Sequence, residues 1–207
     1  MKISYAITVC TEAQEFRKLL NFLVPLIREE DEIVVLQDVS KSCDEGVYRV
    51  TQDFVDHIET LVTSKFEGDF AAWKNMLNSY CTGDYIFQLD ADEIPETVLI
   101  QNLPKILELN TGVDLIWVPR DNRVEGITAD DIRKWHWRVE ETGRINWPDL
   151  QGRIYRNVPS IKWEGKVHEK IVGIETYSFL PDKFCLHHNK TITKQREQNT
   201  LYNTIQR

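Results

Sequence analysis

The sequence predicts an α/β protein built on a mostly parallel, doubly wound sheet. Segments with strand and helix patterns alternate from the N-terminus to about residue 110, as in sheets whose strands are joined by crossover helices. Three predicted strands run directly into polar residues, at 11–12, 38–40 and 90–93. Because ligands bind at the carboxyl ends of strands in such sheets, these three segments are expected to form a common binding rim.

The first half supplies the strands and helices of this sheet. Short apolar runs predict strands at 3–9, 32–36, 59–63 and 85–89. Helical spacing predicts helices at 13–28, 44–57, 69–80 and 96–109. Pro25 conflicts with the first helix, which should end or kink there. Asp69 is expected to cap the third helix, whose apolar face would be Phe70, Trp73, Met76 and Leu77.

The second half predicts a mixed β region followed by a C-terminal helix. Strands are expected at 114–119, 134–139 and 184–188, with a hairpin formed by 152–157 and 160–163. A polar helix is expected at 191–206. Five of the six tryptophans lie in this half, where they suit either a sugar's apolar surface or core packing, which is the more common use.

Length and composition indicate a single globular domain over residues 1–207, with halves at 1–110 and 111–207. The net charge of -8 argues against broad binding to nucleic acid or anionic lipid. The four cysteines are far apart and include no CxxC pair, which favours reduced thiols in a cytosolic protein over a zinc site or disulfide framework. Neither a signal-peptide pattern nor an apolar run of membrane-spanning length is found.

Asp90, Asp92 and Glu93 place three carboxylates within four positions at the end of the fourth strand. Carboxylates this close repel one another unless a cation lies among them, and oxygen ligands suit Mg²⁺ or Mn²⁺. The alternative is a solvated acidic turn before the next helix. GxGxxG and GxxxxGK[ST] loops are absent from the sequence, so bound phosphates would need a metal and basic side chains such as Arg153.

Further candidates lie in the second half of the chain. His168 could complete a metal site with Asp92, or be a surface histidine. His187 and His188 alternate along a strand, so only one of them can point toward such a site. Asp149 follows a Trp-Pro turn, where it is either a general base or an ordinary turn aspartate.

These segments together resemble the family 2 glycosyltransferases, which have the nucleotide-sugar-binding GT-A fold. The opening strand ends in Thr11-Glu12, where the family usually has Asn-Glu. The second strand keeps Asp38 and Ser40 of an Asp-Asp-Gly-Ser ending. Residues 90–93, Asp-Ala-Asp-Glu, match the Asp-x-Asp motif of a branch that modifies bacterial surface glycans.

The resemblance covers nearly the whole chain and implies roles for individual residues. Lys74-Asn75 is similar to an Arg-Asn pair of that branch, and His168-Glu169 is similar to its downstream His-Glu. It implies that Asp92 binds a metal bridging the donor diphosphate, with one of His168, His187 and His188 as a further ligand. The residues expected to contact the nucleotide-sugar are Thr11, Glu12, Asp38, Ser40, Lys74, Asn75, Asp90 and Arg153.

The function expected from the sequence is metal-dependent, inverting transfer of a sugar from a nucleotide-sugar, preferably a UDP-sugar, to a hydroxyl acceptor. The acceptor would be a glycan, a lipid-linked molecule or another alcohol, the cofactor Mn²⁺ or Mg²⁺, and the location cytoplasmic or peripheral at the inner face of a membrane. Asp149 is the expected base and Glu169 the alternative. Two other hypotheses are a nucleotidyltransferase of related fold and a non-catalytic nucleotide-sugar-binding module.

Overall fold

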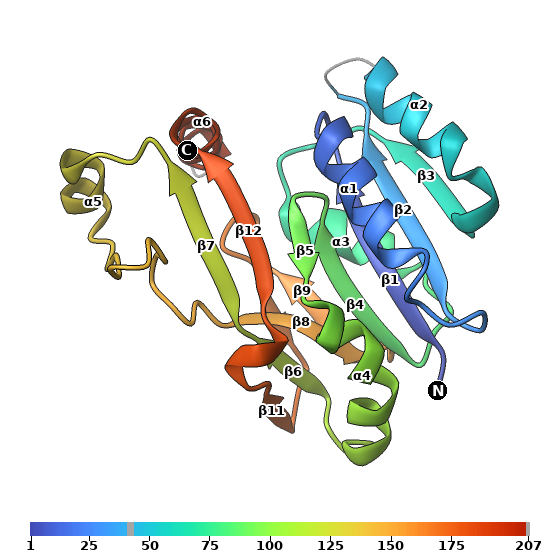
Figure 1. Ribbon diagram of the computed structural model, residues 1–207. Helices are drawn as coiled ribbons and strands as arrows, with labels where there is room; N and C mark the ends of the chain where they lie inside the picture. Colours follow the sequence, from blue (N-terminus) through green and yellow to red (C-terminus); the bar gives the residue numbers. More distant parts are fainter. Residues whose placement is uncertain (41–43, 206–207) are drawn as a thin grey trace.

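A computed structural model describes residues 1–40 and 44–205. Its central sheet has, within the described residues, seven strands in the order β11-β6-β8-β4-β1-β2-β3 (Figure 1). The strands are β1 (Ile3–Val9), β2 (Glu32–Asp38), β3 (Thr60–Ser64), β4 (Tyr85–Asp90), β6 (Leu115–Val118), β8 (Gln151–Arg156) and β11 (Tyr177–Phe179). Pairings among β3, β2, β1 and β4 are parallel, whereas β8 runs antiparallel to β4 and β6. The predicted fold class is therefore confirmed.

Helices cover both faces of this sheet because its strands alternate side chains between two apolar cores. One core contains Tyr5, Ile7 and Phe87 and is closed by α1 (Ala13–Leu23), α2 (Glu45–Asp53) and α4 (Thr97–Leu109). The other contains Ala6 and Ile86 and is closed by α3 (Phe70–Asn78). A short 3-10 helix, η1 (Val55–His57), follows α2.

Most predictions for the first half are confirmed, with two local differences. α1 ends at Leu23, two residues before Pro25, whose ring and missing N–H oppose a continuing helix. Asp69 caps α3 by accepting from the Ala72 backbone N–H at 2.8 Å. Met76 was expected in the apolar face of α3 but is 39% exposed, and Lys74 is buried there instead.

Two predictions for the second half are wrong. Residues 134–139 do not form a strand, because a capping box between Thr128 and Asp131 starts helix α5 (Ala129–Trp135), and left-handed His136 ends it. Residues 152–163 do not form a hairpin. β8 inserts between β4 and β6, while β9 (Lys162–Glu164) pairs with β10 (Lys170–Val172).

Only part of a second sheet, which lies beside the central one, was predicted from the sequence. It has, among the described residues, the order β5-β12-β7, formed by β5 (Glu93–Pro95), β12 (Leu186–Thr191) and β7 (Arg120–Glu125) (Figure 1). β5 has only three residues, too few to show a period, and β7 is almost entirely polar, so neither shows the apolar alternation that marks a strand. A 3-10 turn, η2 (Asp182–Phe184), precedes β12, and helix α6 (Ile192–Ile205) follows it. None of the helices in the two described segments has the length and apolar character to cross a bilayer.

Candidate functional site

The polar segments after β1, β2 and β4 meet at one edge of the central sheet, as predicted. β1 lies between β2 and β4 and is parallel to both. The Thr8 hydroxyl at the end of β1 donates to Asp90 Oδ1 at 3.0 Å. The Cys10 thiol donates to Asp38 Oδ2 at 3.4 Å. These contacts place Asp38 and Asp90 on either side of the segment that follows β1.

Asp38 is held by several donors at this rim. Its Oδ1 accepts from the backbone N–H groups of Ser40 at 2.8 Å and Phe66 at 3.0 Å, and its Oδ2 accepts from the Ser40 hydroxyl at 2.9 Å. Burial raises the pKa of the Asp38 carboxyl, but these hydrogen bonds outweigh burial and hold the pKa below its usual value. Asp38 is therefore a fixed, ionised acceptor.

Glu12 is positioned by the turn that follows β1. Its Oε2 accepts from the backbone N–H groups of Cys10 at 2.9 Å and Thr11 at 3.0 Å. The Thr11 side chain is exposed at the same turn. Both residues thus lie at the predicted rim, with Glu12 also satisfying amides ahead of α1.

Two arginines neutralise much of the acidic cluster. Glu93 is fully buried, and its Oε1 accepts from Arg120 Nη1 at 2.9 Å and from Arg153 Nη2 at 2.5 Å. Arg153 Nη2 also donates to Asp90 Oδ2 at 2.7 Å. Burial opposes ionisation of Asp90, but the charges of Arg153 and Lys74 outweigh it and hold the Asp90 pKa far below normal. Repulsion among these carboxylates is therefore relieved in large part by basic side chains of the protein itself.

Arg153, which the sequence predicts at the donor, is buried and paired with carboxylates of the acidic cluster. Arg153 is only 3% exposed, and its Nη2 is engaged by Asp90 and Glu93. Lys190, on β12, is a basic residue that the sequence did not single out. Burial and the nearby charge of Arg120 lower the Lys190 pKa to about 8. Lys190 thus adds a lysine to the two arginines beside the acidic cluster.

Asp92 and His188 face each other across the site. The Oδ2 atom of Asp92 lies 3.4 Å from Nε2 of His188, which is 6% exposed. β12 pairs with β5 so that His188 lies opposite Glu93, the residue after Asp92. Burial raises the pKa of Asp92, but its interaction with His188 outweighs burial and lowers the pKa overall. Of the histidines that the sequence left open, His188 is the one placed beside Asp92.

The two other histidines have different neighbours. His187 points to the opposite face of β12, where its Nε2 lies 2.8 Å from Glu96 Oε1. His168 is exposed, and its ring centre lies 5.5 Å from that of Tyr202 in α6. The alternation expected for His187 and His188 is confirmed.

Asn122, a residue that the sequence did not single out, fixes which nitrogen of His188 carries a proton. The Asn122 side-chain NH₂ donates to Asp149 Oδ2, because an ionised carboxylate can only accept. The Asn122 Oδ1 atom must then be the acceptor from His188 Nδ1, 2.7 Å away. With Nδ1–H held by Asn122, protonated His188 donates Nε2–H to Asp92, which is the contact that lowers the Asp92 pKa, whereas neutral His188 directs the lone pair of Nε2 at Asp92. Two acceptors facing each other require a cation, either a proton or a metal ion, between them.

The pair of Asp92 and His188 fits Mn²⁺ or Mg²⁺. Ligand atoms about 2.1 Å from an octahedral ion lie about 3 Å apart when adjacent and farther apart at wider angles. The observed 3.4 Å between Asp92 Oδ2 and His188 Nε2 lies in this range. Carboxylate and imidazole are both suitable ligands for Mn²⁺, and the bond from His188 Nδ1 to Asn122 is the orienting contact that metal-binding histidines usually have.

Asp149, the expected base, is anchored at the same site. Its Oδ2 accepts from Arg120 Nη2 at 2.8 Å and Nε at 2.9 Å, as well as from Asn122. Its Oδ1 accepts from the neutral Gln151 amide at 3.1 Å. The Asp149 side chain is 23% exposed. Oδ1 therefore keeps a lone pair that is not engaged by an arginine.

Lys74, Asn75 and Glu169 form a neighbouring group that joins α3 to β9 and the loop after it. Lys74 Nζ donates to Glu169 Oε1 at 2.6 Å and lies 4.2 Å from the centre of the Trp163 ring. Asn75 donates to Trp163 O at 2.8 Å and accepts from Trp163 N at 2.9 Å. Asn75 thus has a bracing role that the sequence did not reveal, because its partner lies 88 residues away.

A family model described as glycosyl transferase family 2 matches residues 4–161. The chain belongs to this family. The match spans β1 to β4 and reaches past β8, so it includes Asp38, Asp90, Asp92 and Asp149. β12, which carries His188, lies beyond it.

Two curated glycosyltransferases match most of this chain. The SPbeta prophage-derived glycosyltransferase SunS of Bacillus subtilis is 26% identical over 171 residues, which are 81% of this chain and 34% of SunS. The glycosyltransferase SunS of Bacillus phage SPbeta matches to the same extent. The chain thus spans about a third of the length of these curated relatives.

Solved structures of S. aureus TarS share the GT-A fold of the chain. The complex of TarS 1–349 with UDP superposes with a TM-score of 0.64 at 16% identity, covering 99% of this chain and 65% of TarS. The complex with UDP-GlcNAc gives a TM-score of 0.61 at 18% identity, covering 92% and 59%. At this identity the likeness establishes the fold.

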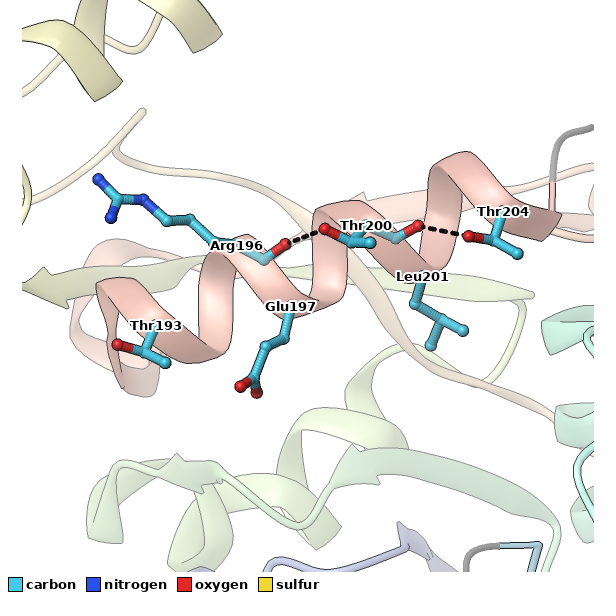
Figure 2. Close-up of a pocket in the computed structure, with 6 residues that line it drawn as sticks. All are labelled: Thr193, Arg196, Glu197, Thr200, Leu201 and Thr204. Atoms are coloured by element: carbon cyan, nitrogen blue, oxygen red, sulfur yellow. Dashed lines mark hydrogen bonds between the residues drawn. The ribbon is translucent and has the colours of Figure 1, made fainter.

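A groove on α6 is separate from this site. Figure 2 shows its lining, Thr193, Arg196, Glu197, Thr200, Leu201 and Thr204, all from α6 itself. The acidic cluster and His188 do not contribute to it. The chemistry of the chain is therefore assigned to the rim of the sheet and not to this groove.

Proposed function

We propose that this protein is a metal-dependent, inverting glycosyltransferase that uses a nucleotide-sugar, preferably a UDP-sugar, and a hydroxyl acceptor. The observation that carries the proposal is the pair of Asp92 Oδ2 and His188 Nε2, two acceptors 3.4 Å apart at the carboxyl rim of the sheet. Membership of glycosyl transferase family 2 supports the reaction class. UDP and UDP-GlcNAc in the TarS complexes support the donor class.

Asp92 and His188 would hold Mn²⁺ or Mg²⁺. When bound, the ion stabilises the negative charge that develops on the leaving nucleoside diphosphate. Asn122 keeps His188 in the tautomer whose Nε2 can bind the metal. Lys190 adds positive charge beside the same diphosphate position.

The nucleotide would lie along the ends of β1, β2 and β4. Asp38 and Asp90 are fixed carboxylates that can accept from the base and ribose, with Thr11, Glu12 and Ser40 beside them. Lys74 and Asn75 would border the diphosphate from α3. Because Arg153 holds Asp90 by an ion pair, its main contribution is to orient that acceptor.

Asp149 would act as the general base through Oδ1. The acceptor hydroxyl transfers its proton to this oxygen while its own oxygen bonds to the anomeric carbon from the face opposite the leaving group. The bond from that carbon to the diphosphate oxygen breaks in the same step, which inverts the configuration. Glu169 is the alternative base, but its Oε1 is engaged by Lys74 at 2.6 Å.

The proposal is tested first by donor binding. Thermal unfolding is measured with Mn²⁺ and each of UDP-, GDP-, dTDP- and CMP-sugars, and a bound donor raises the midpoint by mass action. We expect the largest Mn²⁺-dependent shift with a UDP-sugar, followed by hydrolysis of that donor without acceptor. Asp92→Asn should abolish both effects, whereas Asp56→Asn, an exposed control, should preserve them.

Other outcomes would overturn the proposal in defined ways. Donor binding without turnover would identify a binding module, and consumption of a nucleoside triphosphate would identify a nucleotidyltransferase.

The base is tested with Asp149→Asn, whose remaining oxygen can still accept from Asn122. We expect loss of transfer with donor and Mn²⁺ binding retained, and near-normal turnover would remove Asp149 from the role.

A further inference from the structure

We propose that Glu96, Cys185 and His187 form a zinc site that is distinct from the site of Asp92. Side chains alternate along a strand, so His187 lies on the face of β12 opposite His188. β5 and β12 are antiparallel neighbours, and Glu96 directly follows β5 while Cys185 directly precedes β12. The strand pair therefore presents one set of ligands on each face.

The three side chains already converge. His187 Nε2 lies 2.8 Å from Glu96 Oε1, and the potential ligand atoms of all three residues lie within 4.8 Å of one another. The Glu96 backbone N–H donates to Cys185 O at 2.9 Å, which fixes the two backbones side by side. The side chains of Glu96 and His187 are 41% and 37% exposed, so they can rotate apart to admit an ion from solvent.

The kinds of donor atom select zinc. Thiolate sulfur and imidazole nitrogen are preferred ligands of Zn²⁺, whereas Mg²⁺ and Mn²⁺ favour oxygen. One thiolate from Cys185 and one carboxylate from Glu96 balance the charge of the ion. The absence of a CxxC pair argued against zinc at the level of sequence, but this set draws its residues from segments 89 positions apart.

Asp121, the neighbour of His187 on β7, does not supply a fourth ligand. His187 and Asp121 are partners in the parallel register of β12 and β7. Both oxygens of Asp121 are engaged, by Arg123 at 3.1 Å and by Arg144 at 3.1 Å. Three protein ligands and one water would therefore complete a tetrahedral ion.

Zinc at this position would fasten the start of α4 to the start of β12. The same strand pair holds Glu93 and His188 on its other face. The ion would thus stabilise the register that brings His188 to Asp92, without contacting the donor. This proposal does not depend on the glycosyltransferase assignment, and its tests use no activity measurement.

Cobalt substitution tests the site directly, because a thiolate bound to Co²⁺ gives a charge-transfer absorption in the near ultraviolet. In Asp92→Asn, which lacks the metal ligand of the rim, we expect this band to saturate at one equivalent of Co²⁺ per chain and to be removed by Zn²⁺. Cys185→Ser should abolish the band, while Cys81→Ser, a matched buried thiol, should retain it. Asp92→Asn should also retain it, which separates this site from the rim.

A second measurement covers the case in which Cys185→Ser fails to fold. Zinc affinity is measured by competition with a chromophoric chelator in His187→Ala and Glu96→Gln, both at partly exposed positions. Each variant should bind Zn²⁺ at least about 10-fold more weakly, while exposed His57→Ala should match the wild type. Absence of the cobalt band, its survival in Cys185→Ser, or unchanged zinc affinity in His187→Ala would overturn the proposal.

Discussion

Asn122 is the residue on which the proposed metal site depends most closely. It donates to Asp149 and accepts from His188, so it links the proposed base to the proposed metal ligand. The uncharged amide of Asn122 thereby determines which ring nitrogen of His188 carries the proton. Such orienting contacts usually matter nearly as much for metal affinity as the ligands themselves.

We predict that Asn122→Ala weakens Mn²⁺ binding by about 10- to 100-fold, because His188 loses the acceptor that fixes its proton on Nδ1. Free Mn²⁺ measured by electron paramagnetic resonance during titration gives the affinity. Exposed Asn102→Ala should bind Mn²⁺ like the wild type. Equal affinities for Asn122→Ala and the wild type would contradict the assigned tautomer.

Glu93 is a buried carboxylate that serves as a counter-charge for two arginines. We predict that Glu93→Gln lowers the free energy of unfolding by about 3 kcal/mol, because Arg120 and Arg153 each lose a buried counter-charge. Urea unfolding measures the change. Glu108→Gln, which breaks an exposed pair with Lys105, should cost less than about 1 kcal/mol. Similar losses in the two variants would show that the buried cluster is not coupled as described.

At the scale of elements, the side chain of Asn75 connects helix α3 to the backbone of strand β9. Its amide group pairs with both backbone polar atoms of Trp163, as a neighbouring strand would. The same helix carries Lys74 to Glu169. Displacing β9 would therefore move several of the residues expected at the donor.

We predict that Asn75→Ala lowers the free energy of unfolding by about 1–3 kcal/mol, since it leaves the Trp163 N–H and C=O without these partners. Urea unfolding and UDP binding should be measured together. Exposed Asn21→Ala on α1 should change neither. A loss of UDP affinity without a loss of stability would instead indicate that Asn75 acts as a direct ligand.

At the scale of the whole molecule, Glu32 joins three segments at the amino ends of the central strands. It accepts from Ser4 at 2.5 Å, from the Thr82 hydroxyl and backbone at 2.6 Å, and pairs with Lys2 at 2.6 Å. Burial raises the pKa of Glu32, but these partners outweigh burial and lower it to about 2. Because the folded pKa is depressed, the ionised form stabilises the fold.

We predict that this stabilisation is present above pH 5 and is lost as the pH falls through about 4.5 toward about 2. A shift of this size corresponds to about 3 kcal/mol. Urea unfolding of Glu32→Gln should therefore show a smaller loss of stability between pH 5 and pH 3 than the wild type. Exposed Glu59→Gln should retain the wild-type dependence, and identical slopes for all three proteins would contradict the prediction.

The sequence by itself determined the alternation of strands and helices in the first half, the convergence of Asp38 and Asp90 at one rim, and the opposite faces of His187 and His188. These follow from periodicity over a few neighbouring residues, which is local information. Local periodicity did not predict β5, which has only three residues, or β7, whose residues are almost all polar.

Only the tertiary structure decided which groups meet across the fold. It selected His188 over His168 as the partner of Asp92, gave Glu93 its two arginines, and gathered Glu96, Cys185 and His187 on the far side of the same strands. These contacts join segments that lie 27 to 96 positions apart, so they depend on strand register and on the pairing of buried charges. Neither the strand register nor the pairing of buried charges can be inferred from the residue pattern of a single segment.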